Sequence, residues 1–326
     1  MDSQWNHKIF NVLDSDFDDL AVSVYRYQYE NNHVYRQFSD ALYKNPDVVR
    51  SLEQVPYLPV SFFKSHQVMT SVFEPDIVFE SSGTSATVNS RHLVRDISLY
   101  EKSFVKGFNR LYGEIGEWCV IGLLPSYLEK GNSSLVYMID KLIQLSAHPD
   151  SGFYLYDFAR LKDKLSILEA MNQKTLLVGV TYALLDFAEL FQIKLRHTVV
   201  METGGMKGRR KELLRDEVHK RLCKAFEVDR IHSEYGMTEL LSQAYSPGNG
   251  VFSCPPWMKI LVRDEEDPLT VSRYGKGVIN VIDLANIYSC SFIATDDAGK
   301  LNDDGSFEVL GRTDGSDLRG CSLLTL

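Results

Sequence analysis

Short apolar runs alternate with amphipathic segments through the middle of this chain of 326 residues, and this alternation constrains the fold more than any other feature. The segments between the runs have helical patterning, as in 96–112 and in 132–144, which Asn132 or Ser133 can cap. The runs that we expect to form strands are DIVFE (76–80), EWCVIGLLP (117–125), TLLVGV (175–180), HTVVME (197–202) and VDRIHSEYG (228–236). Strands that alternate with helices predict an α/β fold, with a mostly parallel sheet and helices on its faces.

The regions on either side of this alternation have a different character. Residues 14–43 are expected to be helical and rich in aromatic side chains, ending before Asn45-Pro46. Two prolines in VPYLPVSFFKSH (55–66) then favour an extended stretch. From about residue 247, short strands separated by Gly and Pro predict a smaller β-rich subdomain. The strands expected there are FSCPPWMKILVRD (252–264), GVINVIDL (277–284) and CSFIATDD (290–297).

The composition indicates an ordinary globular protein and argues against several partners. Hydrophobic residues make up 44% of the chain and charged residues 24%. A net charge of -9 disfavours nucleic acid and anionic membranes, since both attract cationic surfaces. No apolar run is long enough to span a bilayer, and the start MDSQWNHKIF lacks the layout of a secretory signal. The five cysteines form no C-x-x-C pair, so we expect reduced thiols in a cytoplasmic protein.

Polar segments that contain glycine or aspartate follow several of the predicted strands. In a parallel sheet, ligands bind beyond the carboxyl ends of the strands, so these segments could meet in one crevice. Each segment alone is also typical of a turn, and only their shared position predicts a ligand site. The segments are ESSGTSA (80–86), METGGMKG (201–208), SEYGMTE (233–239) and ATDD (294–297).

Several common catalytic motifs are absent from the sequence. It contains no G-x-x-x-x-G-K-[ST], so the hydroxyl-rich segment 81–86 is not a Walker A loop. The absence of G-x-G-x-x-G disfavours a dinucleotide-binding domain, and the absence of G-x-S-x-G disfavours a simple esterase. His92 and Asp96 form an H-x-x-x-D pattern used by some acyltransferases, but Ile97 stands where a glycine is expected. The histidines are scattered, so the sequence predicts no metal cluster.

Four segments, in the appropriate order, resemble the motifs of the adenylate-forming enzymes, which include acyl-CoA synthetases, peptide-synthetase adenylation domains and luciferases. SSGTSA (81–86) is similar to the phosphate loop of these enzymes, and YGMTE (235–239) is similar to their Tyr-Gly-x-Thr-Glu motif. TDD (295–297) is similar to their Thr-Gly-Asp motif, and GRTDGSDLRG (311–320) is similar to their Gly-Arg-x-Asp hinge. The resemblance implies the large-domain fold of these enzymes for residues 1–311, with mostly parallel sheets and the β-rich subdomain. It also implies a hinge and short tail at 312–326, with the small C-terminal domain truncated.

A narrower resemblance is to the LuxE family of acyl-protein synthetases. The similar segments are LPVSFFKS (58–65), LPSYLEKGNSSLVYMID (124–140), TLLVGVTYALLDFAE (175–189) and RGCSLL (319–324). This resemblance implies a ligase that activates a fatty acid with ATP and carries the acyl group on a cysteine near its C-terminus. It further implies that the acyl group passes to a partner protein, such as a reductase or a carrier.

The superfamily resemblance also implies roles in nucleotide binding. Thr238 would contact the α-phosphate of ATP, and Glu239 would hold Mg²⁺, which prefers carboxylate and phosphate oxygens. Asp297 would accept hydrogen bonds from the ribose hydroxyls, with Arg312 close by. Tyr235, next to Gly236, would stack on adenine. A first set of residues would bind the β/γ-phosphates through hydroxyl and N–H groups, and two glycines would let the backbone approach the adenine and the acyl group. Those residues are Ser81, Ser82, Gly83, Thr84 and Ser85 for the phosphates, and Gly204 and Gly205 for the close approach.

Cys321 is the cysteine that the narrower resemblance points to as the acyl carrier. It lies in a tail that contains glycine, and Arg319 nearby would favour the thiolate, which is the reactive form. Full-length adenylate-forming enzymes have a lysine in their small C-terminal domain that assists adenylation, and no residue matches it here. Arg91, Lys207 and Arg209 are the cations that we considered as substitutes.

Two alternatives remain open at the level of the sequence. The acyl group could pass to coenzyme A or to an acyl-carrier thiol, independently of Cys321. The chain could also be a nucleotide-binding module without catalytic activity. The presence of Thr238, Glu239, Asp297 and Arg312 together disfavours this last alternative, since a non-catalytic protein has no need for both metal and ribose contacts.

Overall fold

The computed structural model describes residues 2–81, 88–124, 132–204 and 213–313. Its main elements are two large sheets and a separate pair of strands. The α-helices of the described residues are α1 (Asp2–Phe10), α2 (Phe17–Asn31), α3 (His33–Ala41), α4 (Phe62–Ser65), α5 (Ile97–Tyr112), α6 (Ser134–Ser146), α7 (Phe158–Ala170), α8 (Thr181–Leu190) and α9 (Arg215–Phe226). The strands in the first half of the chain are β1 (Leu58–Pro59), β2 (Ile77–Glu80), β3 (Arg91–Val94), β4 (Cys119–Leu123), β5 (Gly152–Phe153) and β6 (Thr175–Val180). Those in the second half are β7 (Thr198–Thr203), β8 (His232–Tyr235), β9 (Ala244–Ser246), β10 (Val251–Phe252), β11 (Met258–Arg263), β12 (Val271–Ser272), β13 (Gly275–Asp283), β14 (Phe292–Leu301) and β15 (Phe307–Arg312).

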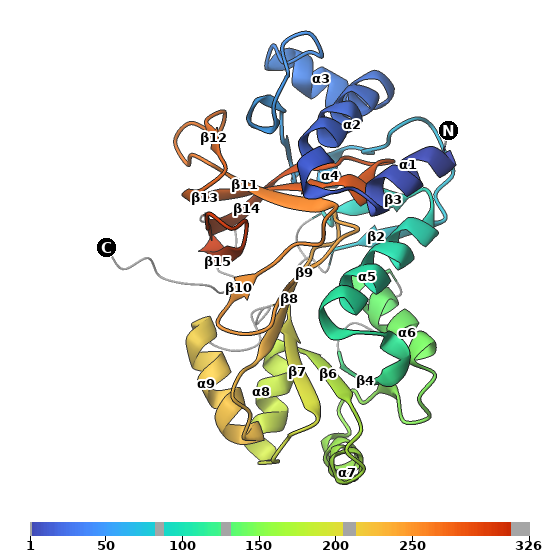
Figure 1. The fold of residues 1–326 in the computed structure, drawn as a ribbon, viewed down its shortest axis with the longest axis vertical. Coiled ribbons are helices and arrows are strands. Elements are labelled where there is room, and N and C mark those ends of the chain that lie inside the picture. The colour runs from blue at the N-terminus through green and yellow to red at the C-terminus, as the bar shows by residue number, and fades with distance from the viewer. Residues whose placement is uncertain (1, 82–87, 125–131, 205–212, 314–326) are drawn as a thin grey trace.

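The predicted parallel sheet is confirmed. Its strands are in the order β5-β4-β6-β7-β8-β9, and all neighbouring pairs are parallel except β8 with β9. Every residue of β4 and β6 is buried, which is what a strand covered on both faces requires. Helices α8 and α9 lie on one side of this sheet, and α5 and α6 lie on the other (Figure 1). The carboxyl ends of β6, β7 and β8 therefore meet at one edge.

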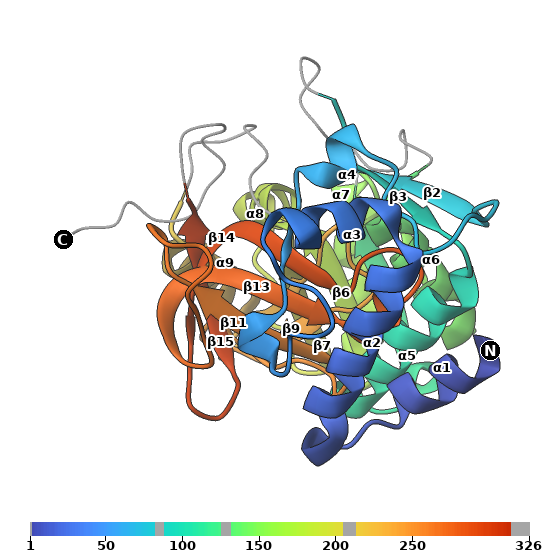
Figure 2. The ribbon, with the colours of Figure 1, turned by 90° about the horizontal axis from the view of Figure 1, so that it is seen from above.

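The second sheet contains the β-rich region predicted after residue 247. Its order is β10-β15-β14-β13-β11-β12, and these neighbours are antiparallel. The short strand β1 joins it from the first half of the chain and pairs in parallel with β14. Helices α2 and α3 pack close to β14, where Tyr35 stacks on Phe292 with ring centroids 6.1 Å apart (Figure 2). The first hundred residues thus help to build the sheet that the last hundred form.

Two details of the predicted pattern are wrong. The strand predicted at 76–80 is not part of the parallel sheet, because β2 pairs only with β3, antiparallel, through residues 77–80 and 91–94. The hydroxyl-rich segment therefore joins two strands of a hairpin and does not lead from a strand into a helix. The segment Thr295–Asp297 does not follow a strand either, since it lies inside β14, which continues to Leu301.

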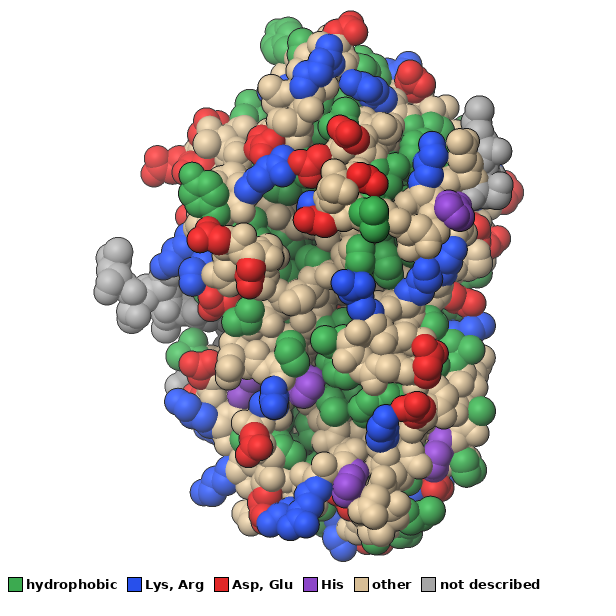
Figure 3. Space-filling view, in the orientation of Figure 1, with side chains coloured by type: hydrophobic (Ala, Val, Ile, Leu, Met, Phe, Trp, Pro, Cys, Tyr) green, Lys and Arg blue, Asp and Glu red, His purple; other side chains and the backbone are tan. Residues whose placement is uncertain are grey.

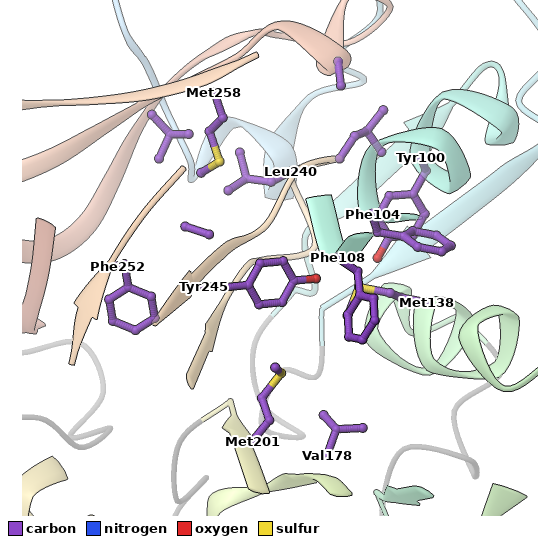
Figure 4. Packing of buried hydrophobic residues seen from close by; sticks show 14 of the residues in the cluster. Tyr100, Phe104, Phe108, Met138, Val178, Met201, Leu240, Tyr245, Phe252 and Met258 are labelled. Carbon is purple, nitrogen blue, oxygen red and sulfur yellow. The ribbon is translucent and has the colours of Figure 1, made fainter. Parts of the chain in front are cut away.

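Large apolar side chains fill the space between the parallel sheet and α5 and α6. Phe104 and Phe108 of α5 are buried, and Met138 of α6 lies close to Phe108 (Figure 4). Tyr245 of β9 extends toward Phe108, and Met201 extends from β7 toward the same region (Figure 4). Burying one such side chain contributes about 1.5–3 kcal/mol. This core holds the ends of β7 and β8 in place. The polar segments that contain Gly204 and Thr238 come directly after these two strand ends in the sequence.

In the described part of the chain, no helix is both long and apolar enough to cross a bilayer. On the face shown in Figure 3, acidic and basic side chains are interspersed without a continuous basic stripe.

Candidate active site

The Thr238–Glu239 segment follows β8 and is held by side chains from distant parts of the chain. The Nδ1 atom of His92, on β3, lies 2.8 Å from the carbonyl oxygen of Thr238 and donates to it. Asn286 donates from Nδ2 to the carbonyl oxygen of Glu239 at 2.7 Å. Leu240, which comes next, is fully buried. The backbone of this segment is therefore fixed on both sides, which orients the Thr238 and Glu239 side chains.

Asp283 anchors the residues just beyond Glu239. Its Oδ2 atom accepts from the backbone N–H groups of Leu241 at 2.8 Å and Ser242 at 2.9 Å. Its Oδ1 atom accepts from the Ser242 hydroxyl at 2.6 Å and from the N–H of Ala285 at 3.1 Å. A buried carboxylate with this many donors is strongly attached to its surroundings, because each lost bond would leave a buried N–H group without a partner.

Glu239 is the buried acid of the site. Its side chain lies only 5% exposed. Burial raises the pKa of Glu239, while hydrogen bonding by Ser90 and the positive charges of Arg312 and Lys64 act in the opposite direction. Cations from α4 and β15 therefore act on the same carboxyl group, which makes this region suitable for binding an anion close to a metal ion.

Asp297, Arg312 and Tyr235 form a second group, also held by pairing of the strands. Asp297 on β14 is directly opposite Arg312 on β15, and Arg312 Nε lies 3.3 Å from Asp297 Oδ1. The Tyr235 hydroxyl donates to Asp297 Oδ2 at 2.8 Å. The net effect of burial is to raise the pKa of Asp297, although Arg312 and Tyr235 act against it. The Tyr235 ring packs edge-on against Phe252 and Phe307, so its observed role is to orient Asp297, and stacking on adenine stays a prediction.

The glycines near β7 and β8 that the structure describes have conformational reasons to be glycine. Gly204 follows β7 with φ +55°, a left-handed conformation that glycine adopts without strain. A Cβ atom on Gly236 would lie 2.4 Å from Oε1 of Glu234, which is closer than contacts allow. The chain therefore adopts a left-handed conformation at the end of β7, and its backbone passes close to a side chain at the end of β8.

The described end of the hydroxyl-rich segment connects directly to this site. Ser81 continues the β2–β3 ladder, since its N–H donates to the Ser90 carbonyl at 3.0 Å and its hydroxyl accepts from the Ser90 N–H at 2.9 Å. Ser90 in turn bonds Glu239. Arg91, considered above as a substitute cation, forms an ion pair with Glu80 at 3.6 Å. Several predicted site residues lie outside the described residues, namely Ser82, Gly83, Thr84, Ser85, Gly205 and Cys321. Lys207 and Arg209 also lie outside them.

A polar cluster at the ends of β7 and β8 did not emerge from the sequence. The Glu202 carboxylate accepts hydrogen bonds from the hydroxyl groups of Ser233 at 2.8 Å and Thr181 at 3.0 Å. Its Oε1 atom also lies 3.5 Å from His219 Nε2 and 3.7 Å from Arg215 Nε. Although burial acts to raise the pKa of Glu202, the hydrogen bond with His219 and the charge of Arg215 lower it to about 2. The cluster fastens α9 to the sheet. The only signal in the sequence was the occurrence of acidic and hydroxyl residues at two successive strand ends.

Glu234 lies on the other face of the same strands. Its carboxyl group accepts a hydrogen bond from the Thr203 hydroxyl. Burial raises the pKa of Glu234 to about 7, so this side chain is partly protonated at neutral pH. Glu202 and Glu234 are the same residue type and differ only in the side chains around them, so the sequence alone could not distinguish the two carboxyl groups.

The H-x-x-x-D pattern is not a catalytic pair. Asp96 accepts from the N–H of Ser98 at 2.9 Å and caps the start of α5. His92 is completely buried and burial lowers its pKa to about 4, so it is neutral and serves to hold Thr238.

The chemistry of the donor set fits one magnesium ion bound together with phosphate groups. No group of three or more His, Cys, Asp or Glu side chains converges to bind a metal anywhere among the described residues. Glu239 is a buried carboxylate that follows Thr238 in the sequence, and Mg²⁺ is commonly bound by one or two carboxylates plus substrate phosphates. The site therefore fits a metal that arrives with its nucleotide.

Comparison with solved structures identifies the class of fold. 2-Hydroxyisobutyryl-CoA ligase, in an open conformation with 2-HIB-AMP and CoA, is similar with a TM-score of 0.64 and 14% identity, over 94% of this chain and 77% of that one. ATP-bound MatB from Rhodopseudomonas palustris is similar with a TM-score of 0.55 and 18% identity, over 74% of this chain and 50% of that one. The chain matches about half the length of MatB. The fold is that of the adenylate-forming ligases, as predicted.

Comparison of sequences then gives the family. Residues 14–325 match the family described as acyl-protein synthetase, LuxE. The long-chain-fatty-acid–luciferin-component ligase of Vibrio harveyi is 24% identical over 332 residues, which cover 93% of this chain and 85% of the relative. The chain therefore belongs to the LuxE family of acyl-protein synthetases. It is a ligase, and the predicted ATP-dependent activation of a carboxylic acid followed by transfer to a protein thiol is confirmed at the level of the family.

Proposed function

We propose that this enzyme activates a long-chain fatty acid with ATP and loads the acyl group onto Cys321 before a partner protein receives it. The observation that carries the proposal is that β8 of the parallel sheet meets β14 and β15 of the second sheet here. Tyr235 of β8 donates to Asp297 of β14, which also pairs with Arg312 of β15, and the Thr238–Glu239 segment follows β8 directly. The fatty acid is suggested by the name of the Vibrio harveyi relative, and the cysteine by the RGCSLL segment.

The first half-reaction would join two anions. An oxygen of the fatty-acid carboxylate attacks the α-phosphorus of ATP, the bond from that phosphorus to the bridging oxygen breaks, and pyrophosphate leaves with the electron pair. Thr238 would donate to the α-phosphate and Asp297 would hold the ribose, so that the reacting atoms are aligned without loss of further entropy during the step. Glu239 would hold Mg²⁺, which neutralises phosphate charge when it is bound.

The second half-reaction would move the acyl group to sulfur. The Cys321 thiolate attacks the acyl carbonyl carbon, a thioester forms, and AMP leaves with the electrons of the former C–O bond. Arg319, two residues away in the sequence, would favour the thiolate over the thiol. A second thiol on a reductase or carrier partner would then receive the acyl group by thioester exchange.

A cytoplasmic location is part of the same proposal. A carrier thiol must stay reduced, and reducing conditions keep cytoplasmic thiols free. Cys119, Cys223, Cys254 and Cys290 are all free in the described part of the chain, which agrees with such a compartment.

The proposal is tested by exchange and labelling experiments on the purified chain. With a panel of carboxylic acids, we expect ATP–pyrophosphate exchange that depends on a long-chain fatty acid. A radioactive acid should label the protein with ATP present, and hydroxylamine should release the label. Cys321→Ser should keep the exchange and lose the label, whereas labelling that persists in this variant would exclude Cys321.

Absence of exchange with every acid, in protein that still binds ATP, would instead indicate a non-catalytic nucleotide-binding module. Thioester formation on added coenzyme A at equal rates in wild type and Cys321→Ser would indicate a different acceptor.

A further inference from the structure

The short helix α4 is attached to the same strand that carries Asp297. It follows β1, whose Pro59 pairs with Ala294 on β14, and the N–H of Val60 donates to the Ala294 carbonyl at 2.9 Å. Ala294 is three residues before Asp297 on β14. Helix α4 therefore begins directly beside the strand that supplies the expected ribose contact.

Helix α4 is also packed against the residue that holds Thr238. Phe63 is 1% exposed, and its ring meets the His92 ring edge-on with centroids 5.7 Å apart. His92 is the residue that donates to the Thr238 carbonyl. Figures 1 and 2 both show α4 next to β3, which carries His92. The position of α4 is thus fixed relative to both halves of the nucleotide site.

Lys64 extends from this fixed helix and is exposed. Within the described ranges it forms no ion pair with a carboxylate, in contrast to Arg312, which is held by Asp297, and Arg91, which is held by Glu80. Lys64 is adjacent to Phe63, whose ring meets the His92 ring, and His92 holds the Thr238 carbonyl, so the Lys64 side chain begins close to the Thr238–Glu239 segment. A lysine that is exposed, without an ion-pair partner and close to the expected magnesium ligand is available to a bound anion.

We propose that Lys64 is a catalytic residue of the adenylation step, whose ammonium group contacts the phosphates of ATP bound beside Thr238 and Glu239. This inference rests on the proposed function. As the carboxylate oxygen attacks and the bond to pyrophosphate breaks, negative charge grows on the departing oxygens, and Lys64 stabilises that charge by donating hydrogen bonds without giving up its proton. The flexible four-carbon side chain lets the ammonium follow the phosphates as they separate.

Nucleotide binding gives the first test. Lys64→Met keeps the length of the side chain and removes the charge, and Lys64→Arg restores the charge. By calorimetry, we expect Lys64→Met to raise the Kd for Mg-ATP about 10- to 100-fold, as for loss of one charge-assisted contact. Lys64→Arg should stay within about threefold of wild type. The Kd for adenosine, which has no phosphate, should not change in either variant.

Salt dependence and a matched control separate charge from structure. The Kd of wild type for Mg-ATP should rise more steeply with salt than the Kd of Lys64→Met, because one screened contact is missing in the variant. The control is Lys162→Met on α7, a partly exposed lysine that pairs with Asp163 and lies far from α4, and this variant should bind Mg-ATP like wild type (Figure 1). All variants should melt at the wild-type temperature, since both lysines are on the surface.

The exchange assay then distinguishes the two proposals. At saturating ATP, a weaker affinity for ATP no longer limits the rate. Fatty-acid-dependent exchange should nevertheless be slower in Lys64→Met than in wild type. If wild type exchanges and Lys64→Met matches it in Kd, salt dependence and exchange rate, the role of Lys64 is refuted and the proposed function stands. If wild type itself shows no exchange with any acid, the proposed function fails and this role fails with it.

Discussion

Glu234 gives a sharp test of the electrostatics at the end of β8. Its carboxyl group has a pKa of about 7 in the folded protein, raised by burial from 4.5, and Thr203 supplies the hydrogen bond that holds it. Its charge also acts on the hydroxyl groups of Tyr100 and Tyr245, which are buried in the core beside it. The perturbation that we propose is Glu234→Gln, which keeps the shape and the bond from Thr203 but cannot ionise.

The direction of the effect follows from the two pKa values. The folded state binds the proton more tightly than the unfolded state, so its stabilising contribution is complete below pH 4.5 and is lost as the pH rises through 7. A shift from 4.5 to about 7 corresponds to roughly 3.4 kcal/mol at 1.36 kcal/mol per pH unit. Because the side chain is partly exposed, we expect about 2–3 kcal/mol in the free energy of unfolding.

Urea unfolding of wild type and Glu234→Gln between pH 5 and 8.5 measures this difference, and other titrating groups cancel in the comparison. The variant should gain about 2–3 kcal/mol relative to wild type over that range. Glu227→Gln is the control, because Glu227 is exposed on the surface and its loss should change stability by less than about 0.5 kcal/mol. Two parallel pH profiles for wild type and Glu234→Gln would show that burial does not raise this pKa.

Three further substitutions test the supports of the site. Asp283→Ala removes the acceptor of three buried backbone N–H groups and should lower the free energy of unfolding, measured in urea, by about 3–5 kcal/mol. Asp283→Asn should lower it less, and a loss below about 1 kcal/mol in Asp283→Ala would show that Asp283 does not anchor these residues. Gly236→Ala should cost about 1–3 kcal/mol through the clash with Glu234, and Glu234→Ala in the same chain should recover most of that loss in a double-mutant cycle. Asp297→Asn should raise the Kd for ATP about 10-fold or more by calorimetry while the protein stays folded, and unchanged affinity would exclude a ribose contact.

Much of the fold could be predicted because its signals are local. The strand predicted at 175–180 is β6 without change, since a short, mostly apolar run bounded by polar residues favours a buried strand. Ser133 caps α6, as expected from its position before the helical pattern. The order of the family motifs also predicted that the YGMTE segment follows a strand, as it does after β8, while the convergence of all four motif segments stays a prediction.

The supports of the site could not be predicted because they join residues far apart in the sequence. His92 holds a carbonyl group 146 residues away, and Asn286 holds one 47 residues away. The β2–β3 hairpin was missed for a similar reason, since the four residues of β3 carry a basic pair and read locally as part of a polar loop. Lys64 was overlooked because nothing in FFKS indicates that α4 lies against His92.

We propose that the end of β8 and the neighbouring strands β14 and β15 form a single binding site for a magnesium nucleotide that activates an acid. A crystal structure with a non-hydrolysable ATP analogue, Mg²⁺ and a long-chain fatty acid tests it most directly. We predict Thr238 and Glu239 within hydrogen-bond or coordination distance of the phosphates and their metal, and Asp297 on the ribose. Electron density for the nucleotide at a site remote from these three side chains would show that they do not form its binding site.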